Sequence, residues 1–211
     1  YIGMELSKLN SGKTRKYDIT VIDNNFFGER VAQLSRWGIN FYQCDILDKE
    51  NIGILLKDAD IIFHLAGITD VPTTVHDSRS KKNNIIDQVG VEGSRNIISL
   101  APKNSKIIFP STHVVFEGLK SVKKNIKEDL KPKPILTYSK GKTVTENDLL
   151  ESNKNFVILR LGSVYGYTGD STRLNIMTNL FGKITSMNGT IKLFSKGQQL
   201  KSIVSVTDVA R

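Results

Sequence analysis

The sequence contains a single cysteine, Cys44, among its 211 residues. One cysteine excludes a disulfide within the chain and is typical of proteins that fold in a reducing compartment. The chain also lacks a run of about eighteen apolar residues, the length needed to span a membrane, and it does not begin like a secretory signal. We therefore expect a cytoplasmic protein without a membrane partner, in which Cys44 is structural.

Clustering of positive charge is also missing, although the formal net charge is +9. The lysines are scattered, and the only adjacent lysine pairs are Lys81-Lys82 and Lys123-Lys124. Surfaces that bind nucleic acid usually combine clustered cations with aromatic residues, so we expect no nucleic-acid partner. The positive field favours an anionic small molecule instead. No metal site is predicted.

Short apolar runs alternate with amphipathic segments along the chain. The runs are residues 17–23, 60–65, 106–109 and 155–161, and the segments are residues 29–37, 48–58, 84–101 and 138–152. Continuous apolar runs suit strands buried on both faces of a parallel sheet. The alternation predicts an α/β, Rossmann-like doubly wound parallel sheet.

Two domains are expected, with the Rossmann-like domain over residues 1–167. The strand–helix rhythm weakens after Tyr167, so residues 168–211 are predicted to begin a small C-terminal lobe interleaved with the last strands. Residues 116–134 are predicted to form a surface loop. No strand precedes the helix-like stretch at residues 4–10, so the first strand is expected to be missing. Residues 203–206 are predicted as a strand without a closing element.

Acidic residues stand at the ends of two predicted strands. Asp23, followed by Asn24, can accept hydrogen bonds from an adenosine ribose and repel a 2′-phosphate, which favours NAD over NADP. Asp45, followed by Ile46, can meet an adenine amino group. Alternatively, each acid caps a helix or turn.

Small residues end the next strand, in the sequence Leu65-Ala66-Gly67. Small side chains allow a ligand to approach the backbone closely. Tight packing against a helix is the alternative interpretation.

The most informative set is Ser111-Thr112 at a strand end, followed by Tyr138 and Lys142 at the start of a helix. Tyr138 and Lys142 are four residues apart and therefore share a helical face. A nearby ammonium favours the phenolate form, and the Thr112 hydroxyl can bond a phenol and a substrate. Together they suit proton transfer coupled to hydride transfer by a nicotinamide.

The order of these motifs resembles the extended short-chain dehydrogenase/reductase family, the NAD-dependent epimerases and dehydratases of nucleotide sugars. Ile2 and Gly3 resemble the end of its glycine-rich loop, and residues 111–116 resemble its S-S-x-x-V-Y segment. Residues 160–166 resemble R-L-G-N-V-Y-G, and residues 197–210 resemble a late segment that ends in V-x-D-V-A.

The resemblance implies roles for these residues in a nucleotide-sugar epimerase, most simply a 4-epimerase with tightly bound NAD. Tyr138 would be the base, Lys142 its partner and a ribose ligand, and Thr112 the hydrogen-bond bridge. The cofactor would contact Ile2, Gly3, Asp23, Asn24, Asp45, Ile46, Leu65, Ala66 and Gly67. The substrate would contact His113, Ser163 and Lys201. A homodimer through residues 84–101 and 138–152 is also implied.

Departures from the family pattern leave alternatives open. Gly90 and Ser163 replace asparagines, and Lys201 replaces an arginine, losing its bidentate fork. His113 and Val114 stand where dehydratases and decarboxylases carry acids, which disfavours dehydration. Residues 111–118 also resemble NAD(P)H-dependent keto-sugar reductases. A catalytically silent NAD- or RNA-binding relative is the third hypothesis, and the trio of Thr112, Tyr138 and Lys142 argues against it. Without the first strand, we expect this chain alone to bind NAD poorly.

Overall fold

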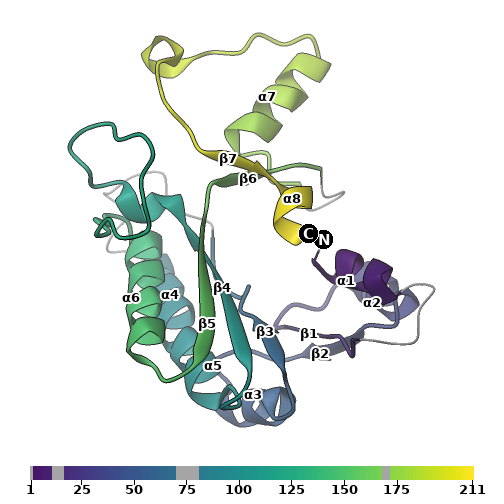
Figure 1. Cartoon of the computed structure of the whole chain (residues 1–211). Coiled ribbons are helices and arrows are strands. Elements are labelled where there is room, and N and C mark those ends of the chain that lie inside the picture. Colours follow the sequence, from purple (N-terminus) through teal and green to yellow (C-terminus); the bar gives the residue numbers. More distant parts are fainter. Residues whose placement is uncertain (1, 11–16, 70–80, 168–171) are drawn as a thin grey trace. The chain divides into compact units, whose positions relative to one another are not determined.

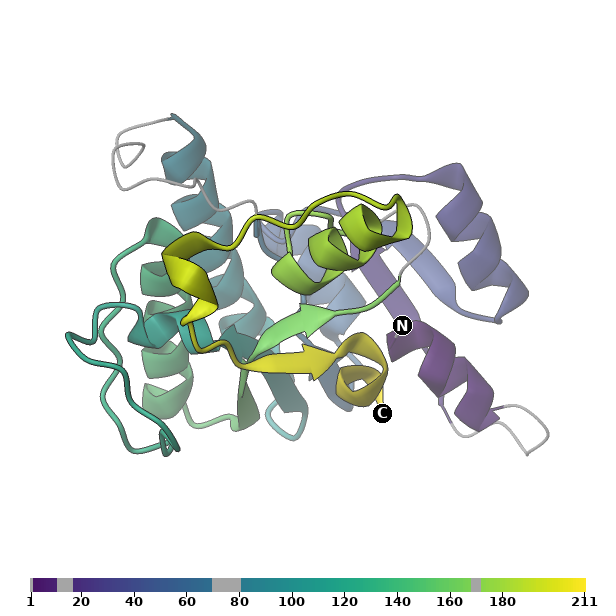
Figure 2. The same ribbon diagram turned by 90° about the horizontal axis from the view of Figure 1, so that it is seen from above.

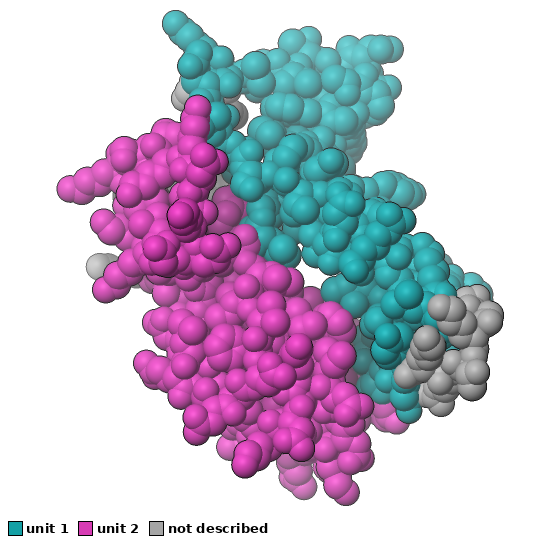
Figure 3. All heavy atoms as spheres, viewed as in Figure 1, with its two compact units in different colours: residues 1–21, 27–41, 161–211 teal, residues 22–26, 42–160 magenta. Residues whose placement is uncertain are grey.

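The computed structural model describes residues 2–10, 17–69, 81–167 and 172–211. The chain divides into two compact units (Figure 3). Unit 1 comprises residues 1–21, 27–41 and 161–211, and unit 2 comprises residues 22–26 and 42–160.

Strands and helices alternate along the chain (Figure 1), which confirms the predicted α/β class. The strands are β1 (Thr20–Asp23), β2 (Asn40–Gln43), β3 (Ile61–Phe63), β4 (Lys106–Thr112), β5 (Asn155–Leu161), β6 (Ser163–Tyr165) and β7 (Ile203–Ser205). The α-helices are α1 (Ile2–Asn10), α2 (Gly28–Arg36), α3 (Lys49–Leu56), α4 (Lys81–Asp87), α5 (Ser94–Leu100), α6 (Thr137–Glu151), α7 (Met177–Ser186) and α8 (Val206–Ala210). A π-helix, η2 (Gln88–Gly93), and two 3₁₀ helices, η3 (His113–Phe116) and η5 (Phe194–Gly197), complete the described elements.

The strands form three sheets, with the orders β1-β2, β3-β4-β5 and β6-β7. The pairs β3–β4 and β6–β7 are parallel, as predicted, with Ile62 opposite Ile107 and Val164 opposite Val204. Among the described residues, no strand joins the β1–β2 pair to β3, and the residues before β1 contribute helix α1. The parallel α/β architecture is therefore present, but its strands do not pair into one continuous sheet.

The core of unit 2 lies between the β3-β4-β5 sheet and helices on one of its faces (Figure 1). It contains Ile62, Ile107 and Phe109 from the strands, Ile52 and Leu56 from α3, Ile97 and Ile98 from α5, and Leu149 from α6. These apolar side chains are removed from water, which is the main favourable contribution to folding.

Burial alternates along β3 because successive side chains point to opposite faces of a strand. Ile62 is 7% exposed, whereas its neighbour Ile61 is 50% exposed. β5 shows the same alternation between exposed and half-buried residues. The prediction of burial on both faces is therefore wrong for β3, where Ile61 and Phe63 are exposed and the described helices of unit 2 pack on the side of Ile62.

A π-helical turn interrupts the helix predicted over residues 84–101. The chain runs from α4 through η2 into α5, so the predicted segment is helical, but its middle has wider turns. Such turns are rare and occur frequently at functional sites. Residues 117–136, between η3 and α6, contain neither helix nor strand, as predicted for the surface loop.

The last residues of unit 1 contain more structure than the sequence suggested. β6 lies beside β7, and helix α7 falls between them in the sequence (Figure 2). The prediction that β7 has no closing element is wrong, because α8 follows it directly. The Ser205 hydroxyl accepts a hydrogen bond from the Thr207 backbone N–H at 3.2 Å and so caps α8. No described helix has the length and apolarity needed to cross a membrane.

Candidate active site

A cleft in unit 2 is formed by the loop after β3, the helix η2 and the start of α6. Its lining includes four of the residues predicted to bind cofactor or substrate: Ala66, Gly67, Tyr138 and Lys142. Gly90 also lines it. A Cβ atom added at Gly67 or Gly90 would meet no atom within 4 Å, so the backbone on this side has open space beside it. The volume of the cleft is about 20 Å³, close to that of one water molecule, so the space beside Gly67 and Gly90 is narrow in this structure.

Lys142 is held in the cleft by the end of β4. Its Nζ donates a hydrogen bond to the carbonyl oxygen of Pro110 at 2.8 Å. The same nitrogen lies 4.3 Å from the centre of the Phe109 ring and 5.9 Å from the centre of the Tyr138 ring. Burial lowers the pKa of Lys142 to about 8, and the charge of Glu146 opposes this shift. At neutral pH the ammonium form still predominates, and its charge lies close to the phenol.

Thr112 is the last residue of strand β4 and is 8% exposed. Its Oγ1 accepts a hydrogen bond from the Val114 backbone N–H at 3.2 Å, which caps η3. Because that bond uses the oxygen as an acceptor, the hydroxyl proton can be donated elsewhere. Thr112 is two residues from Pro110, so the contact of Lys142 fixes the ammonium near this strand end.

A buried ion pair lies behind these groups and was not predicted from the sequence. The Glu146 carboxylate, 2% exposed, accepts a hydrogen bond from Arg160 Nη2 at 2.7 Å. Its other oxygen accepts a hydrogen bond from the Ser111 hydroxyl at 2.5 Å. Glu146 follows Lys142 by four residues and therefore lies on the same helical face as Tyr138 and Lys142. This spacing is the feature of the sequence from which a role for Glu146 could have been predicted.

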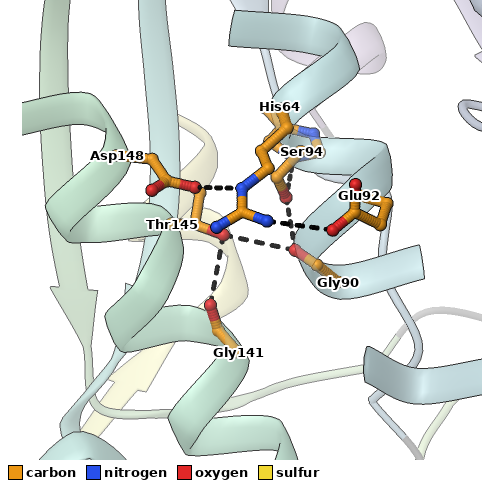
Figure 4. A network of polar contacts seen from close by, with 8 residues as sticks. His64, Gly90, Glu92, Ser94, Gly141, Thr145 and Asp148 are labelled. Carbon is orange, nitrogen blue, oxygen red and sulfur yellow. Dashed lines mark hydrogen bonds and ion pairs between the residues drawn. The ribbon is translucent and has the colours of Figure 1, made fainter. Parts of the chain in front are cut away.

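His64, Ser94, Gly90 and Thr145 form a chain of polar contacts beside the cleft (Figure 4). The Ser94 hydroxyl donates to the Gly90 carbonyl at 2.6 Å, so it must accept the hydrogen bond from His64 Nε2, 2.8 Å away. Burial, and secondarily the charge of Lys142, lowers the pKa of His64 to about 4. The imidazole is therefore neutral, with its proton on Nε2.

The Gly90 carbonyl also accepts a hydrogen bond from Thr145 Oγ1 at 3.2 Å. It lies in the π-helical turn and links η2 to α6 (Figure 4). Gly90 thus stands where the resembling family carries asparagine, and its carbonyl accepts hydrogen bonds from Ser94 and Thr145.

A second cleft in unit 2 contains the acidic strand ends. Its lining includes Asn24 and Asp45, and Asn24 Nδ2 donates to Asp45 Oδ2 at 3.2 Å. Asp23 lies beside them, with its carbonyl accepting from the Cys44 backbone N–H at 3.1 Å. Asp23 Oδ1 accepts from the Asn25 backbone N–H at 2.9 Å, so this carboxylate also stabilises the local turn. The structure brings these three predicted residues together.

Ile46 and Cys44 contribute to the packing of the protein. The Ile46 side chain is in the core, and its carbonyl accepts from Asn96 Nδ2 at 3.0 Å, so a ligand could meet only its backbone N–H. Burial raises the pKa of the Cys44 thiol, which fits the structural role expected for it.

The remaining predicted residues belong to several elements of the two units. Leu65 is exposed beside His64, and His113 begins η3. Ile2 and Gly3 lie in α1, Ser163 begins β6 and Lys201 is exposed, all in unit 1. Among the residues that the structure describes, no group of three histidine, cysteine, aspartate or glutamate side chains is placed to hold a metal ion.

Parallel α/β architecture, with a tyrosine and a lysine one helical turn apart in a cleft, defines a protein of the short-chain dehydrogenase/reductase type. The chain belongs to the NAD dependent epimerase/dehydratase family, whose model matches residues 1–211.

Individual relatives differ in activity. The chain is 33% identical over 104 residues to a UDP-N-acetyl-alpha-D-glucosaminuronate decarboxylase of Bacillus cytotoxicus, covering 48% of this chain and 31% of that protein. It is 30% identical over 118 residues to the UDP-glucose 4-epimerase of Mycoplasma genitalium, covering 55% of this chain and 34% of that protein. The matches thus span about a third of each relative's length.

A solved structure matches the whole chain. The UDP-glucose 4-epimerase of Thermotoga maritima, crystallised with UDP-glucose, superposes with a TM-score of 0.76 at 25% identity. The match covers 100% of this chain and 68% of that one. It supports the Rossmann-like fold class.

Proposed function

We propose that this chain is the NAD-binding catalytic part of a nucleotide-sugar 4-epimerase. The observation that carries the proposal is the meeting of Tyr138 and Lys142 with Ala66 and Gly67 in one cleft. The family match and the similarity to a UDP-glucose 4-epimerase support it. A cytoplasmic location and a homodimer through α4–η2–α5 and α6 belong to the same proposal.

The residues of unit 2 fit a dinucleotide. Gly67 and Gly90 carry no side chain that would block a ligand next to Lys142, and Asp23, Asn24 and Asp45 would hold an adenosine. Bound NAD would supply reversible hydride transfer. The further cofactor contacts would come from Ile2, Gly3, Leu65 and the Ile46 backbone. The proposed domains are residues 1–167 for cofactor and 168–211 for the start of the substrate lobe, and residues 168–171 lie outside the described residues.

Proton transfer falls to three side chains. The Tyr138 phenolate takes the proton of the sugar C4 hydroxyl as the carbon is oxidised and returns it when the carbon is reduced. The Lys142 ammonium, near the ring, stabilises the phenolate. Thr112 donates a hydrogen bond that orients the reacting oxygen. His113, Ser163 and Lys201 would contact the nucleotide sugar.

The 4-epimerase is preferred to a dehydratase or decarboxylase because His113 and Val114 provide no carboxylate after Thr112. The matches to a decarboxylase and to a 4-epimerase cover similar shares of those relatives, 31% and 34%, so the preference rests on His113 and Val114. A keto-sugar reductase is the alternative that the test must distinguish.

The test is to incubate the intact protein with UDP-, GDP- and dTDP-sugars in D₂O and to separate the epimers. A 4-epimerase should interconvert epimers without net consumption of NADH and without deuterium on C4, because hydride returns from the cofactor. Tyr138→Phe should abolish the conversion. Stoichiometric oxidation of NADPH would indicate a reductase, and deuterium incorporation at carbon would exclude the hydride mechanism.

A further inference from the structure

Glu117 is an acidic side chain outside every predicted site, yet it binds the start of the helix that carries Tyr138. It directly follows η3, five residues after Thr112. Its Oε1 accepts hydrogen bonds from the backbone N–H groups of Ile135 and Leu136, each at 2.7 Å. The same oxygen accepts a hydrogen bond from the Ser139 hydroxyl, which is fully buried.

Helix α6 lacks a capping side chain of its own. Its N-cap residue is Leu136, whose side chain makes no capping hydrogen bond. The first N–H groups of a helix have no partner within the helix, and negative charge is favourable at that end. Glu117 supplies, from a distant part of the sequence, an acceptor for the N–H of the N-cap residue Leu136 and for that of the residue before it.

Backbone contacts fix the segment from which Glu117 reaches α6. The Lys133 N–H donates to the Val115 carbonyl, and the Gly118 N–H donates to the Lys133 carbonyl, both at 2.8 Å. A Cβ atom at position 118 would lie 2.5 Å from the Lys133 carbonyl oxygen, so this close approach requires glycine. Residues before and after Glu117 are therefore both hydrogen-bonded to Lys133, at the other end of the 117–136 loop.

The later turns of α6 have other anchors. Lys142 binds the Pro110 carbonyl, and Glu146 binds Ser111. The first turn, with Tyr138 between Leu136 and Ser139, is the part that Glu117 holds.

We propose that Glu117 is a positioning residue for proton transfer, because its carboxylate fixes the Tyr138 turn of α6 against the segment that begins at Thr112. The proposal rests on the proposed function of Tyr138 and Thr112. Catalytic groups must be held close to their productive geometry, and a displacement of about 1 Å can lower a rate by about 100-fold. Glu117 acts through the helix and does not touch the reacting atoms.

The kinetic test compares Glu117→Ala, Glu117→Gln and Glu128→Ala in the intact protein. Glu117→Ala should lower kcat by roughly 10- to 100-fold with KM within about twofold, because the geometry of the phenol changes more than substrate binding. Glu117→Gln should keep kcat within about threefold, since an amide oxygen can accept the same bonds. Glu128→Ala, at an exposed position in the same loop, is the matched control and should behave as the parent.

A pair of variants addresses the case in which Glu117→Ala folds poorly. Ser139→Ala removes one of the three donors, and kcat should fall by roughly 3- to 10-fold. The double variant Glu117→Ala, Ser139→Ala should be no slower than Glu117→Ala, because the two residues share one interaction. The proposal would be overturned if the decreases in kcat of the two single variants multiplied in the double variant. An unchanged kcat in Glu117→Ala would also overturn it.

Amide hydrogen exchange tests the same contact without relying on activity. In Glu117→Ala, exchange at residues 135–140 should rise at least about tenfold, while residues 143–151 stay protected. Parent-like exchange at residues 135–140 would also overturn the proposal. If exchange responds as expected but the parent converts no nucleotide sugar, the proposed function fails and the helix contact stands.

Discussion

Lys142 donates its hydrogen bond to the carbonyl oxygen of Pro110, 2.8 Å away, and so connects helix α6 to the strand that ends at Thr112. The contact also places the ammonium over the Phe109 ring and near Tyr138. One backbone carbonyl thus helps to set the positions of the hydroxyl, the phenol and the cation on which the proposed chemistry depends.

Replacing Lys142 by methionine should lower kcat/KM by roughly 100-fold or more, because the phenolate loses its stabilising charge. The pH dependence provides a second signature. The pKa of Lys142 is lowered to about 8, so parental activity should fall as pH rises through that value and the ammonium loses its proton. This alkaline limb should be missing in Lys142→Met. Rate profiles from pH 6 to 10 measure both effects, and an unchanged alkaline limb in the variant would assign it to another group.

Replacing Asp23 by alanine should weaken the preference for NAD over NADP. The carboxylate accepts bonds from a ribose and repels a 2′-phosphate, so its loss should reduce the ratio of the two dissociation constants by about tenfold or more. Titration calorimetry with both dinucleotides measures the ratio. Asp58→Ala, an exposed aspartate in unit 2, is the control. If both variants keep the parental ratio, Asp23 stabilises the turn at Asn25 and does not select between the two dinucleotides.

Replacing Glu146 by glutamine should destabilise the fold by about 3 kcal/mol, because Arg160 would lose its partner in a largely buried setting. Glu151→Gln, at an exposed position on the same helix, should change stability by less than about 0.5 kcal/mol. Urea unfolding of the two variants and the parent gives the comparison. Equal stabilities would mean that water already screens the ion pair in the folded protein.

The neutral state of His64 predicts a loss of stability in acid. Its folded pKa of about 4 is below its ordinary value of 6.5, so the unfolded chain binds the proton more readily between those values. The contribution, about 3 kcal/mol, is present above pH 6.5 and is lost as pH falls toward 4.

His64→Gln can still donate to Ser94 but cannot titrate in this range. Its stability should therefore fall less between pH 6.5 and 4.5 than that of the parent, as measured by urea unfolding at each pH. The parent protein, measured under the same conditions, is the reference for this slope. Identical slopes in the parent and in His64→Gln would show that His64 does not contribute to the acid sensitivity.

Much of the fold was predictable because helix and strand periodicities are local. The segment predicted at residues 138–152 is α6 at 137–151, and the run at residues 155–161 is β5. The error about burial had a non-local cause. An apolar run such as β3 is compatible with one covered face or two, and only the packed helices decide which.

Sequence alone determined the order of the elements, the helical face shared by Tyr138 and Lys142, and the small residues at Ala66-Gly67, because spacing along one strand or helix specifies these directly. Tertiary structure decided which distant side chains meet. Glu117 reaches Leu136 across 19 residues of sequence and His64 reaches Ser94 across 30. Such contacts depend on how separate elements pack together, and no periodicity within a single segment contains that information.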